Sequence, residues 1–376
     1  MGEGLAGKPV ITLAELVEHS SGDALWLAID DYVYDITEWR HTHPGGPVVL
    51  QNCAGSDASE AFRAYHPAWA RRYLERLCVG RLAARQAVTP LAAAHAQLLA
   101  DLQAEGLFTV NLWDYTRVAV GVTTLLAGAV VCVLQQRAVL GAVLLAAFWQ
   151  QVAFVGHDCG HSAVFQSRRC NQLLGLGVTA ACGISYSWWV DTHNVHHIHP
   201  NAAEHDPDIQ FMPLLAISPV FFKSITSRYH NAVLLFDRFA RQLISWQHIT
   251  FFPLLMVAKY GLYGQALQQL SSGRAYLHRP SEAAAQLLFF LWVGCLTGCL
   301  HSWAARVAFI IVAHAAFAVL HLQICLSHFS RDVYKLESGE QDWLTRQVLS
   351  TQNWSCPAWL DFFHDEEHHM CNSSCS

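Results

Sequence analysis

Two pairs of long apolar segments constrain the fold of this chain more than any other feature of its sequence. One pair runs from Tyr115 to about Gln135 and from Ala138 to Val155, the other from about Ala285 to Leu300 and from about Ala304 to Cys325. A helix needs ~20 residues to cross the hydrocarbon core of a bilayer, so each run has close to the length of one membrane helix. Only short polar breaks separate the runs of a pair. The sequence therefore predicts about four transmembrane helices in two hairpins, rather than a large soluble helical core.

The composition of the chain agrees with a membrane protein. Hydrophobic residues make up 53% of the 376 residues and charged residues only 14%, which is too apolar for an ordinary soluble enzyme. The formal net charge of −6 argues against a nucleic-acid partner. The 12 cysteines follow no regular spacing, and several lie inside the apolar runs. We expect them to be reduced and to behave as small apolar side chains.

The predicted hairpins return the chain to the side of the membrane on which it started. The segment between the hairpins carries basic residues, whereas the hairpin tips carry little charge, and this asymmetry is typical of a cytosolic segment. These basic residues are Arg168, Arg169, Lys223, Arg228, Arg238 and Arg241. Two further apolar stretches, 173–189 and 251–262, are shorter or interrupted, so we expect interfacial helices there, the second with a re-entrant piece as the alternative.

Three histidine clusters lie on the side where the hairpins begin and end. They are His157-Asp-Cys-Gly-His161, His193-Asn-Val-His196-His197 and His364-Asp-Glu-Glu-His368-His369. Positions i, i+3 and i+4 are neighbours on one face of a helix, so these spacings bring imidazoles together. Imidazole suits first-row transition metals, and a set without thiolates indicates exchange-accessible iron rather than structural zinc. Chance clustering is the alternative, since the chain has 22 histidines, but the presence of three clusters beside apolar segments argues against it.

The N-terminal part has the character of a small soluble domain, which we expect over residues 8–82, followed by an Ala- and Gln-rich helical linker over 83–110 and the membrane part over 111–376. His43-Pro-Gly-Gly46 and His66 stand in turn-rich sequence. Two opposed histidines that bind haem iron from both sides leave no open position for oxygen, and this arrangement produces an electron carrier. The chain starts with polar sequence and lacks a secretory or plastid leader pattern, so we expect this domain to remain cytosolic.

With its acidic Asp57 and Glu60 and its size, the N-terminal segment closely resembles the cytochrome b5 domain. The resemblance implies an α+β fold with haem b, whose axial ligands are His43 and His66. The whole chain, from about residue 8 to 364, in turn resembles the cytochrome b5-fusion front-end desaturases, above all the sphingolipid Δ8-desaturases and the acyl-lipid Δ6-desaturases. The stretches that carry this resemblance are 156–161, 188–197, 199–201, 206–208, 224–228, 236–237, 245–248 and 321–329.

The desaturase resemblance implies an all-α membrane domain that holds two non-haem iron ions. The implied iron ligands are His157, His161, His193, His196, His197 and His328, together with His368 and His369 of the third cluster. Acidic neighbours are candidates for orienting the imidazole N–H groups, with helix capping as an equal alternative, and these are Asp158, Asp191, Asp206 and Asp208. For His321 two alternatives stay open: it lines the iron site, or it lies away from it. The other histidines are expected to form ordinary hydrogen bonds or to lie at the membrane interface: His199, His205, His230, His248, His314 and His364.

The third histidine cluster departs from the family pattern. The family carries Gln-x-x-His-His after a Gly-Gly-Leu-Gln-Phe stretch, which is missing here, and Asp365 occupies the Gln position. Either His368 and His369 still bind iron, or the matching sequence stops at His364 and the tail, which looks truncated or altered, is unrelated. The missing stretch favours the second alternative.

The resemblance implies a lipid desaturase that uses O2 and electrons from an NADH-cytochrome b5 reductase-type donor to act on a lipid-linked acyl chain or a sphingoid base. It places the protein in the endoplasmic reticulum membrane, with the haem domain and histidine clusters on the cytosolic side. Two alternatives stay open. One is a lipid hydroxylase on the same scaffold, and the other is a membrane-bound haem electron carrier with an incomplete iron site.

Overall fold

The N-terminal part of the chain folds into a small α+β domain. The computed structural model describes residues 7–84, 88–272, 276–336, 342–352, 357 and 360–364. The domain's four-stranded sheet has the order β1-β4-β3-β2, with β1 parallel to β4 and the other neighbours antiparallel. Its strands are β1 (Val10–Ile11), β2 (Trp26–Ile29), β3 (Tyr32–Asp35) and β4 (Cys78–Leu82). The predicted α+β character is thus confirmed.

Short helices cover this sheet, and the predicted haem histidines flank two of them: His43 lies in the loop before α2, and His66 directly follows α3. They are α1 (Leu13–Glu18), α2 (Pro47–Cys53), α3 (Ser59–Tyr65) and α4 (Arg71–Leu74). The tight turn between β2 and β3 contains Asp30 at φ 54°, a conformation that Asp tolerates better than most residues. The Asp30 carboxylate accepts hydrogen bonds from Arg63 and Arg71, so this turn is tied to α3 and α4.

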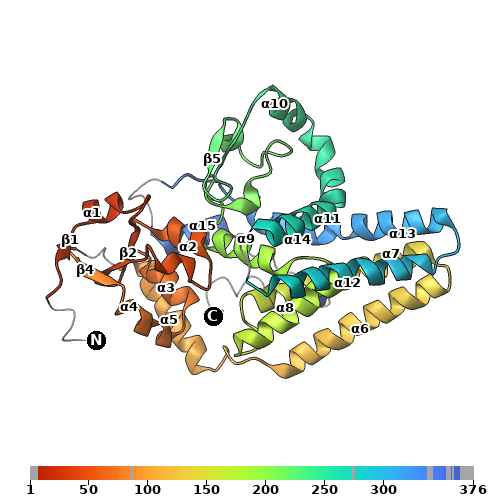
Figure 1. The fold of residues 1–376 in the computed structure, drawn as a ribbon, viewed down its shortest axis with the longest axis horizontal. Helices are drawn as coiled ribbons and strands as arrows, with labels where there is room; N and C mark the ends of the chain where they lie inside the picture. Colours follow the sequence, from red (N-terminus) through yellow and green to blue (C-terminus); the bar gives the residue numbers. More distant parts are fainter. Residues whose placement is uncertain are drawn as a thin grey trace.

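The C-terminal part contains four helical segments long and apolar enough to cross a membrane, among the residues that the structure describes. They are α6 (Leu112–Leu134), α7 (Ala138–Gly160), α12 (Arg279–Gly298) and the combined α13 (Trp303–Ala316) and α14 (Ala318–His328). Figure 1 shows α6 with α7, and α12 with α13, as two hairpins whose tips lie at the end far from the N-terminal domain. The prediction of four membrane helices in two hairpins is therefore confirmed.

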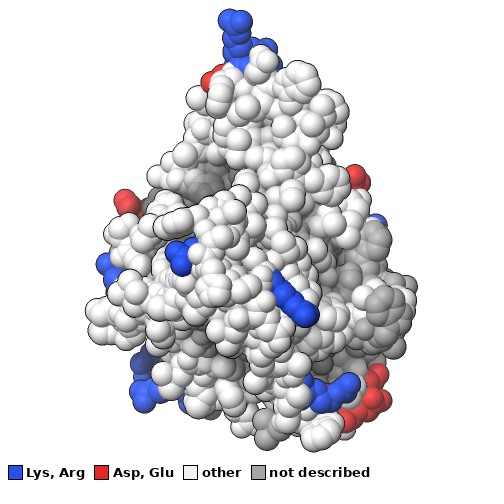
Figure 2. Space-filling view, turned by 90° about the vertical axis from the view of Figure 1, so that its right-hand side faces the viewer, with Lys and Arg blue, Asp and Glu red and all other residues white. Residues whose placement is uncertain are grey.

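The hairpin tips are joined to each other. The Gln136 side chain donates a hydrogen bond to the Cys299 carbonyl (3.0 Å) and accepts one from the His301 amide (2.8 Å), so it links the first hairpin's turn to the second's. Figure 2 views the molecule from this end, and its surface is mostly uncharged, with scattered Lys and Arg side chains and some Asp and Glu side chains near its margins. Such a surface is compatible with a short exposed cap on a membrane bundle.

The segment between the hairpins folds back as a bent pair of helices. α8 (Arg168–Cys182) and α9 (Tyr186–Ile198) meet at an angle of 109°. The bend contains Gly183 at φ +76°, and a Cβ atom there would lie 2.5 Å from the Phe289 ring. The expectation of one interfacial helix over 173–189 is therefore wrong, because only glycine fits both the left-handed conformation and the close approach of α12.

The rest of the segment between the hairpins includes a small two-stranded sheet and two further helices. β5 (Ile225–Ser227) pairs with β6 (Ala232–Leu234), and α10 (Arg238–Ser245) leads into α11 (Gln247–Ser272). The predicted apolar stretch 251–262 lies inside the 26-residue α11, which packs beside α13 and α14. It is thus the middle of a longer helix.

The N-terminal domain packs directly against α9 and α15 (Trp343–Ser350). The linker helix α5 (Pro90–Ala104) contacts α15 and lies next to α3 (Figure 1). Buried side chains of the N-terminal domain form one continuous hydrophobic cluster with Val195 and Ile198 of α9 and with Trp343 and Leu344 of α15. The domain is therefore held on the helix that carries the second histidine cluster.

Candidate functional site

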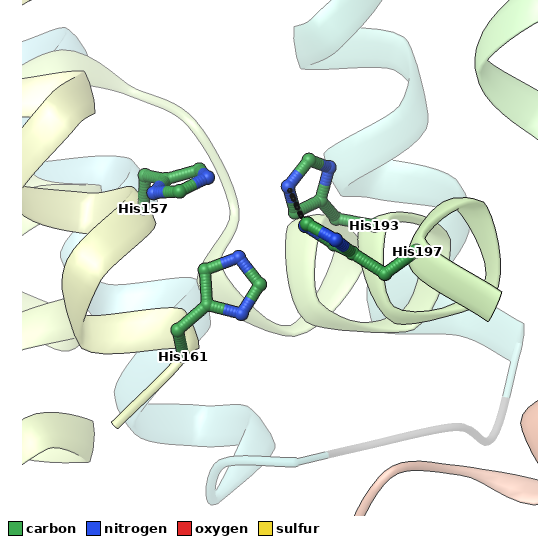
Figure 3. Close-up of side chains that lie close together, drawn as sticks. All are labelled: His157, His161, His193 and His197. Atoms are coloured by element: carbon green, nitrogen blue, oxygen red, sulfur yellow. Dashed lines mark hydrogen bonds between the residues drawn. The ribbon is translucent and has the colours of Figure 1, made fainter. Parts of the chain in front are cut away.

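Four histidines from two helices converge between the membrane bundle and the N-terminal domain. His157 and His161 come from the C-terminal end of α7, and His193 and His197 from α9; Figure 3 shows the two pairs pointing toward each other. One ring nitrogen of each residue lies within 4.8 Å of those of the other three. The Nε2 atoms of His193 and His197 are 2.8 Å apart. We call these residues the four-histidine cluster.

A second group lies on the neighbouring face of α9. His196 Nε2 lies 3.2 Å from Nε2 of His328, the last residue of α14. His196 Nδ1 donates to the Asp206 carboxylate at 2.9 Å, and Asp208 lies 3.9 Å away. His196, Asp206 and Asp208 form a second set with metal-ligand spacing. The structure therefore brings together every predicted iron ligand that it describes, in two adjacent groups.

The start of α9 is fixed by buried polar contacts. Ser185 is its N-cap, and the Ser185 hydroxyl accepts from the Trp188 amide at 3.1 Å. The Glu282 carboxylate of α12, only 2% exposed, accepts from the Ser185 hydroxyl (2.6 Å) and the Ser187 amide (2.9 Å). A helix N-terminus has unpaired N–H groups and a positive dipole end, so a buried carboxylate is stabilised there. This contact sets the position of α9 against the bundle.

Burial and neighbouring charges give the α9 histidines different protonation preferences. Burial, followed by the neighbouring His193 and His161, lowers the pKa of His197 well below its usual value, so this ring is neutral at pH 7. Burial also disfavours a charge on His196, but the Asp206 carboxylate outweighs it and raises the pKa of His196 to about 9. Neutral imidazole is the form that binds a metal, so His197 of the four-histidine cluster is in the protonation state that a metal ligand needs.

The acidic neighbours have separate roles. Asp206 contacts His196, and Asp208 lies 3.5 Å from His193. Asp158 lies 3.5 Å from His157 and accepts a hydrogen bond from the Tyr115 hydroxyl. Asp158, Asp206 and Asp208 are therefore each close enough to an imidazole to help orient it.

Asp191 makes different contacts. It accepts hydrogen bonds from Tyr229 and Tyr276, each at 3.0 Å. Its carboxylate therefore links α9 to two loops.

The predicted haem ligands lie opposite each other in the N-terminal domain. The ring centroids of His43 and His66 are 5.8 Å apart, and Phe62 stacks on His66 at 4.5 Å. Burial, then the neighbouring His66, lowers the pKa of His43 to about 4, and burial also lowers the pKa of His66. Both rings are therefore neutral at pH 7.

Both sites fit the groups that the sequence resemblance implies. A metal ion about 2 Å from one nitrogen of each of two facing imidazoles requires ring centroids about 6 Å apart. The centroids of His43 and His66 are 5.8 Å apart, which is close to this value. At the second site, His196 Nδ1 and His328 Nδ1 point to oxygen acceptors, Asp206 (2.9 Å) and the Ser350 carbonyl (3.3 Å). With both Nδ1 atoms protonated, the two Nε2 atoms present lone pairs to each other, so a proton or a metal cation is needed between them.

Two sets of hydrogen bonds were not anticipated from the sequence, and the first of them lies at the site. The Asn201 side chain donates to the His328 carbonyl at 2.9 Å, and its amide donates to Asp206 at 2.8 Å. Asn201 has φ +61°, which Asn tolerates, and it follows His199-Pro200, a turn signal. The Gln150 and Gln323 side chains each donate to the Phe363 carbonyl at 2.9 Å.

The remaining histidines occupy varied positions. His199 Nε2 donates to the Asn52 carbonyl at 3.2 Å, and His314 contacts the Ile310 carbonyl and the Tyr263 hydroxyl. His321 packs edge-on against Phe317.

His248 is exposed. His364 is the last residue of α16 (Asp361–His364), and His368 and His369 lie outside the described residues.

Comparison with known proteins gives two family matches. Residues 137–371 match the model "Fatty acid desaturase", and residues 12–83 match "Cytochrome b5-like Heme/Steroid binding domain". The first match includes His368 and His369. Together the two matches cover both parts of the described fold.

Curated relatives resemble the chain over nearly its full length. It is 38% identical to Delta(8)-fatty-acid desaturase 2 of Arabidopsis thaliana over 96% of this chain and 83% of that protein. It is 34% identical to Delta(8)-fatty-acid desaturase of Helianthus annuus, over 97% and 82%. The Delta 8-(E)-sphingolipid desaturase of Emericella nidulans is 36% identical over 70% and 50%. Among solved structures, cytochrome b558 of Ectothiorhodospira vacuolata matches 20% of this chain and 99% of its own, with 35% identity and a TM-score of 0.19.

Proposed function

The chain belongs to the fatty acid desaturase family and carries a cytochrome b5-like haem domain, and on that premise we propose that it desaturates a sphingoid base at Δ8 or a lipid-linked acyl chain. It is a membrane oxidoreductase that acts on a lipid with electrons from its own haem domain. The observation that carries the proposal is the convergence of the four-histidine cluster with His196 and His328 directly beside that domain.

His43 and His66 are proposed as the two haem ligands. Bound haem would supply one-electron transfer, and with both histidines as ligands its iron would keep no open position for oxygen. The low pKa of His43, about 4, keeps its ring neutral and ready to bind. The haem domain thereby serves only as the electron donor.

The proposed ligands of two iron ions are His157, His161, His193, His196, His197 and His328. Bound iron supplies the oxidising chemistry that removes hydrogen from an unactivated methylene. Asp206 holds the Nδ1 proton of His196 and so turns its Nε2 atom toward His328. Asn201 restrains Asp206 and the end of α14 together, which keeps the two ligands at a fixed separation.

His368 and His369 are proposed as further ligands. Phe363 is held by Gln150, two turns before His157 on α7, and by Gln323 of α14. An extended chain advances up to about 3.5 Å per residue, so the few residues after Phe363 are long enough to reach the site. The family match that extends to residue 371 supports this alternative over an unrelated tail.

We propose that the haem domain and the histidine clusters lie on the cytosolic side of the endoplasmic reticulum membrane. The α7 and α14 ends that carry the histidines lie at the same end of the bundle as the haem domain, and the hairpin tips lie at the other (Figure 1). An NADH-cytochrome b5 reductase-type enzyme is the proposed electron source, and O2 the oxidant.

The test is lipid mass spectrometry on yeast that expresses this chain, with His193→Ala as the control. A new unsaturated sphingoid base, absent from the control, assigns the Δ8-type substrate, and a new polyunsaturated acyl chain assigns the acyl-lipid branch. A hydroxylated lipid instead identifies a hydroxylase. A b-type haem spectrum without any new lipid contradicts the proposal and leaves a membrane-bound electron carrier.

A further inference from the structure

Tyr65 connects the predicted haem histidines to the four-histidine cluster: it is the chain neighbour of His66 and contacts His197. It is the last residue of α3 and is directly followed by His66. Its hydroxyl donates a 3.1 Å hydrogen bond to the backbone carbonyl of His197. Its ring lies edge-on to the His197 imidazole, with centroids 6.2 Å apart. One residue thus contacts the four-histidine cluster and is bonded to a proposed haem ligand.

The His197 carbonyl belongs to the C-terminal turn of α9, where backbone acceptors have no partner within the helix. The Gln347 side chain of α15 donates to the same carbonyl at 3.0 Å, and Trp343 Nε1 donates to the Ile198 carbonyl at 2.9 Å. The Tyr65 ring packs edge-on against Trp343, with centroids 5.7 Å apart. Tyr65 is therefore part of the set of side chains that completes this helix end.

The loop that carries His43 makes its own contacts with α8 and α9. The Asn194 side chain donates to the Gly45 carbonyl at 3.4 Å, and the Arg168 side chain reaches the Pro44 carbonyl at 3.4 Å. A Cβ atom on Gly46 would lie 2.2 Å from the Tyr276 hydroxyl. Both segments with a proposed haem ligand therefore rest on the desaturase part, and no rearrangement is needed to bring them there.

We propose that Tyr65 is a positioning residue that holds the haem domain on α9, and that electrons cross to the iron site along His66, Tyr65 and the hydrogen bond to His197. This inference rests on the proposed function. In each transfer, one electron leaves ferrous haem, which becomes ferric, and reduces one iron ion by one unit; no bond is made or broken and no proton moves. The alternative is a haem domain that dissociates from α9 and rebinds in every catalytic cycle. Electron transfer in that case would not depend on the hydrogen bond from Tyr65 to His197.

The experiment uses the full-length chain in nanodiscs of total yeast lipid, loaded with haem and iron. The haem is reduced with dithionite without oxygen, the excess is removed, and the sample is mixed with oxygenated buffer while haem absorbance reports reoxidation. Tyr65→Phe keeps the ring and removes only the hydroxyl. Tyr73→Phe is the matched control, since Tyr73 is an exposed tyrosine of the same domain that stacks on Trp39.

The expected result for Tyr65→Phe is haem reoxidation about fivefold slower than in wild type, because the hydroxyl that links Tyr65 to the His197 carbonyl is removed and the docked state loses one ordinary hydrogen bond of about 1 kcal/mol, a factor of about five in its equilibrium constant. Rates are taken per haem-containing chain, so partial loss of haem does not imitate the effect. A second readout does not depend on turnover. In the iron-free chain, Tyr65→Phe raises hydrogen exchange in α3 and α15, whereas Tyr73→Phe leaves both helices unchanged.

Three outcomes distinguish a failure of the Tyr65 proposal from a failure of the proposed desaturase function. Slower reoxidation with greater exchange in Tyr65→Phe alone supports the inference. Wild-type rates and exchange in Tyr65→Phe overturn it and leave the desaturase function intact. If wild-type haem is reoxidised no faster than the haem of His193→Ala, the electron supply to the four-histidine cluster is itself refuted, and the inference fails with it.

Discussion

The Nε2 atoms of His196 and His328 lie 3.2 Å apart, although 132 residues separate them along the chain. His328 ends the last membrane helix and His196 lies in the bent segment between the hairpins. The two rings meet at an interplanar angle of 89°. His196 is buried and His328 is half-buried. With Nδ1 of each ring protonated, the facing Nε2 atoms need a shared proton or a cation, and that bound ion joins the membrane bundle to α9.

Replacement of His328 is expected to remove iron selectively. In His328→Ala the iron content of purified protein should fall by about half, because one of two proposed ions loses a ligand, and desaturation should be abolished. Metal analysis and the haem spectrum measure the two cofactors independently. The exposed His248→Ala variant serves as control. Full iron content in His328→Ala would remove this residue from the ligand set.

Asp206→Asn is expected to weaken iron binding without disturbing haem. Asp206 is fully buried and accepts from both His196 Nδ1 and the Asn201 amide. The loss of such an outer partner typically costs 10–100-fold in metal affinity, and we expect roughly that decrease here. Competition with a chelator gives the affinity. Asp237→Asn, at the N-cap of α10, is the control, and equal chelator resistance in the two variants would refute the role of Asp206.

Gly46→Ala should be more harmful than Gly22→Ala. Both glycines have positive φ, +96° and +84°, so both variants carry backbone strain of about 1–3 kcal/mol. Only at Gly46 does an added Cβ meet another group, the Tyr276 hydroxyl at 2.2 Å, whereas Gly22 has open space. We expect slower haem reoxidation in Gly46→Ala alone, measured in the full chain. Equal rates in the two variants would show that the loop does not rest on Tyr276.

The stability of the chain is expected to fall as the pH decreases below neutrality. His205 is 5% exposed, and burial, with help from His199 and nearby arginines, lowers its pKa to about 3. In the unfolded state His205 takes up a proton near its ordinary pKa of about 6.5, whereas in the folded state it stays neutral down to about pH 3. Between neutral pH and pH 5 the free energy of unfolding therefore falls by about 2 kcal/mol.

Thermal unfolding in detergent between pH 7.5 and 5 measures this effect. His205→Gln should be less stable at pH 7.5 but should lose less stability on acidification than wild type. His248→Gln, which alters an exposed histidine, should retain the wild-type slope. An unchanged slope in His205→Gln would assign the acid sensitivity to other groups.

The sequence by itself determined the four membrane helices and the nature of the haem domain. The length of the apolar runs fixes a helix that spans a bilayer, and the four-residue spacing of His157 and His161 fixes their common face. Both are local properties. They depend on the period and length of one segment and on nothing that lies elsewhere in the chain.

Only the tertiary structure decided how these segments meet. The bend at Gly183, the pairing of His196 with His328 and the contact of Tyr65 with His197 join residues far apart in the sequence. Such contacts follow from side-chain packing between helices and from buried polar groups such as Glu282 that must find partners. A spacing rule carries no information about them, because the partner of each group is chosen by the fold and not by its neighbours along the chain.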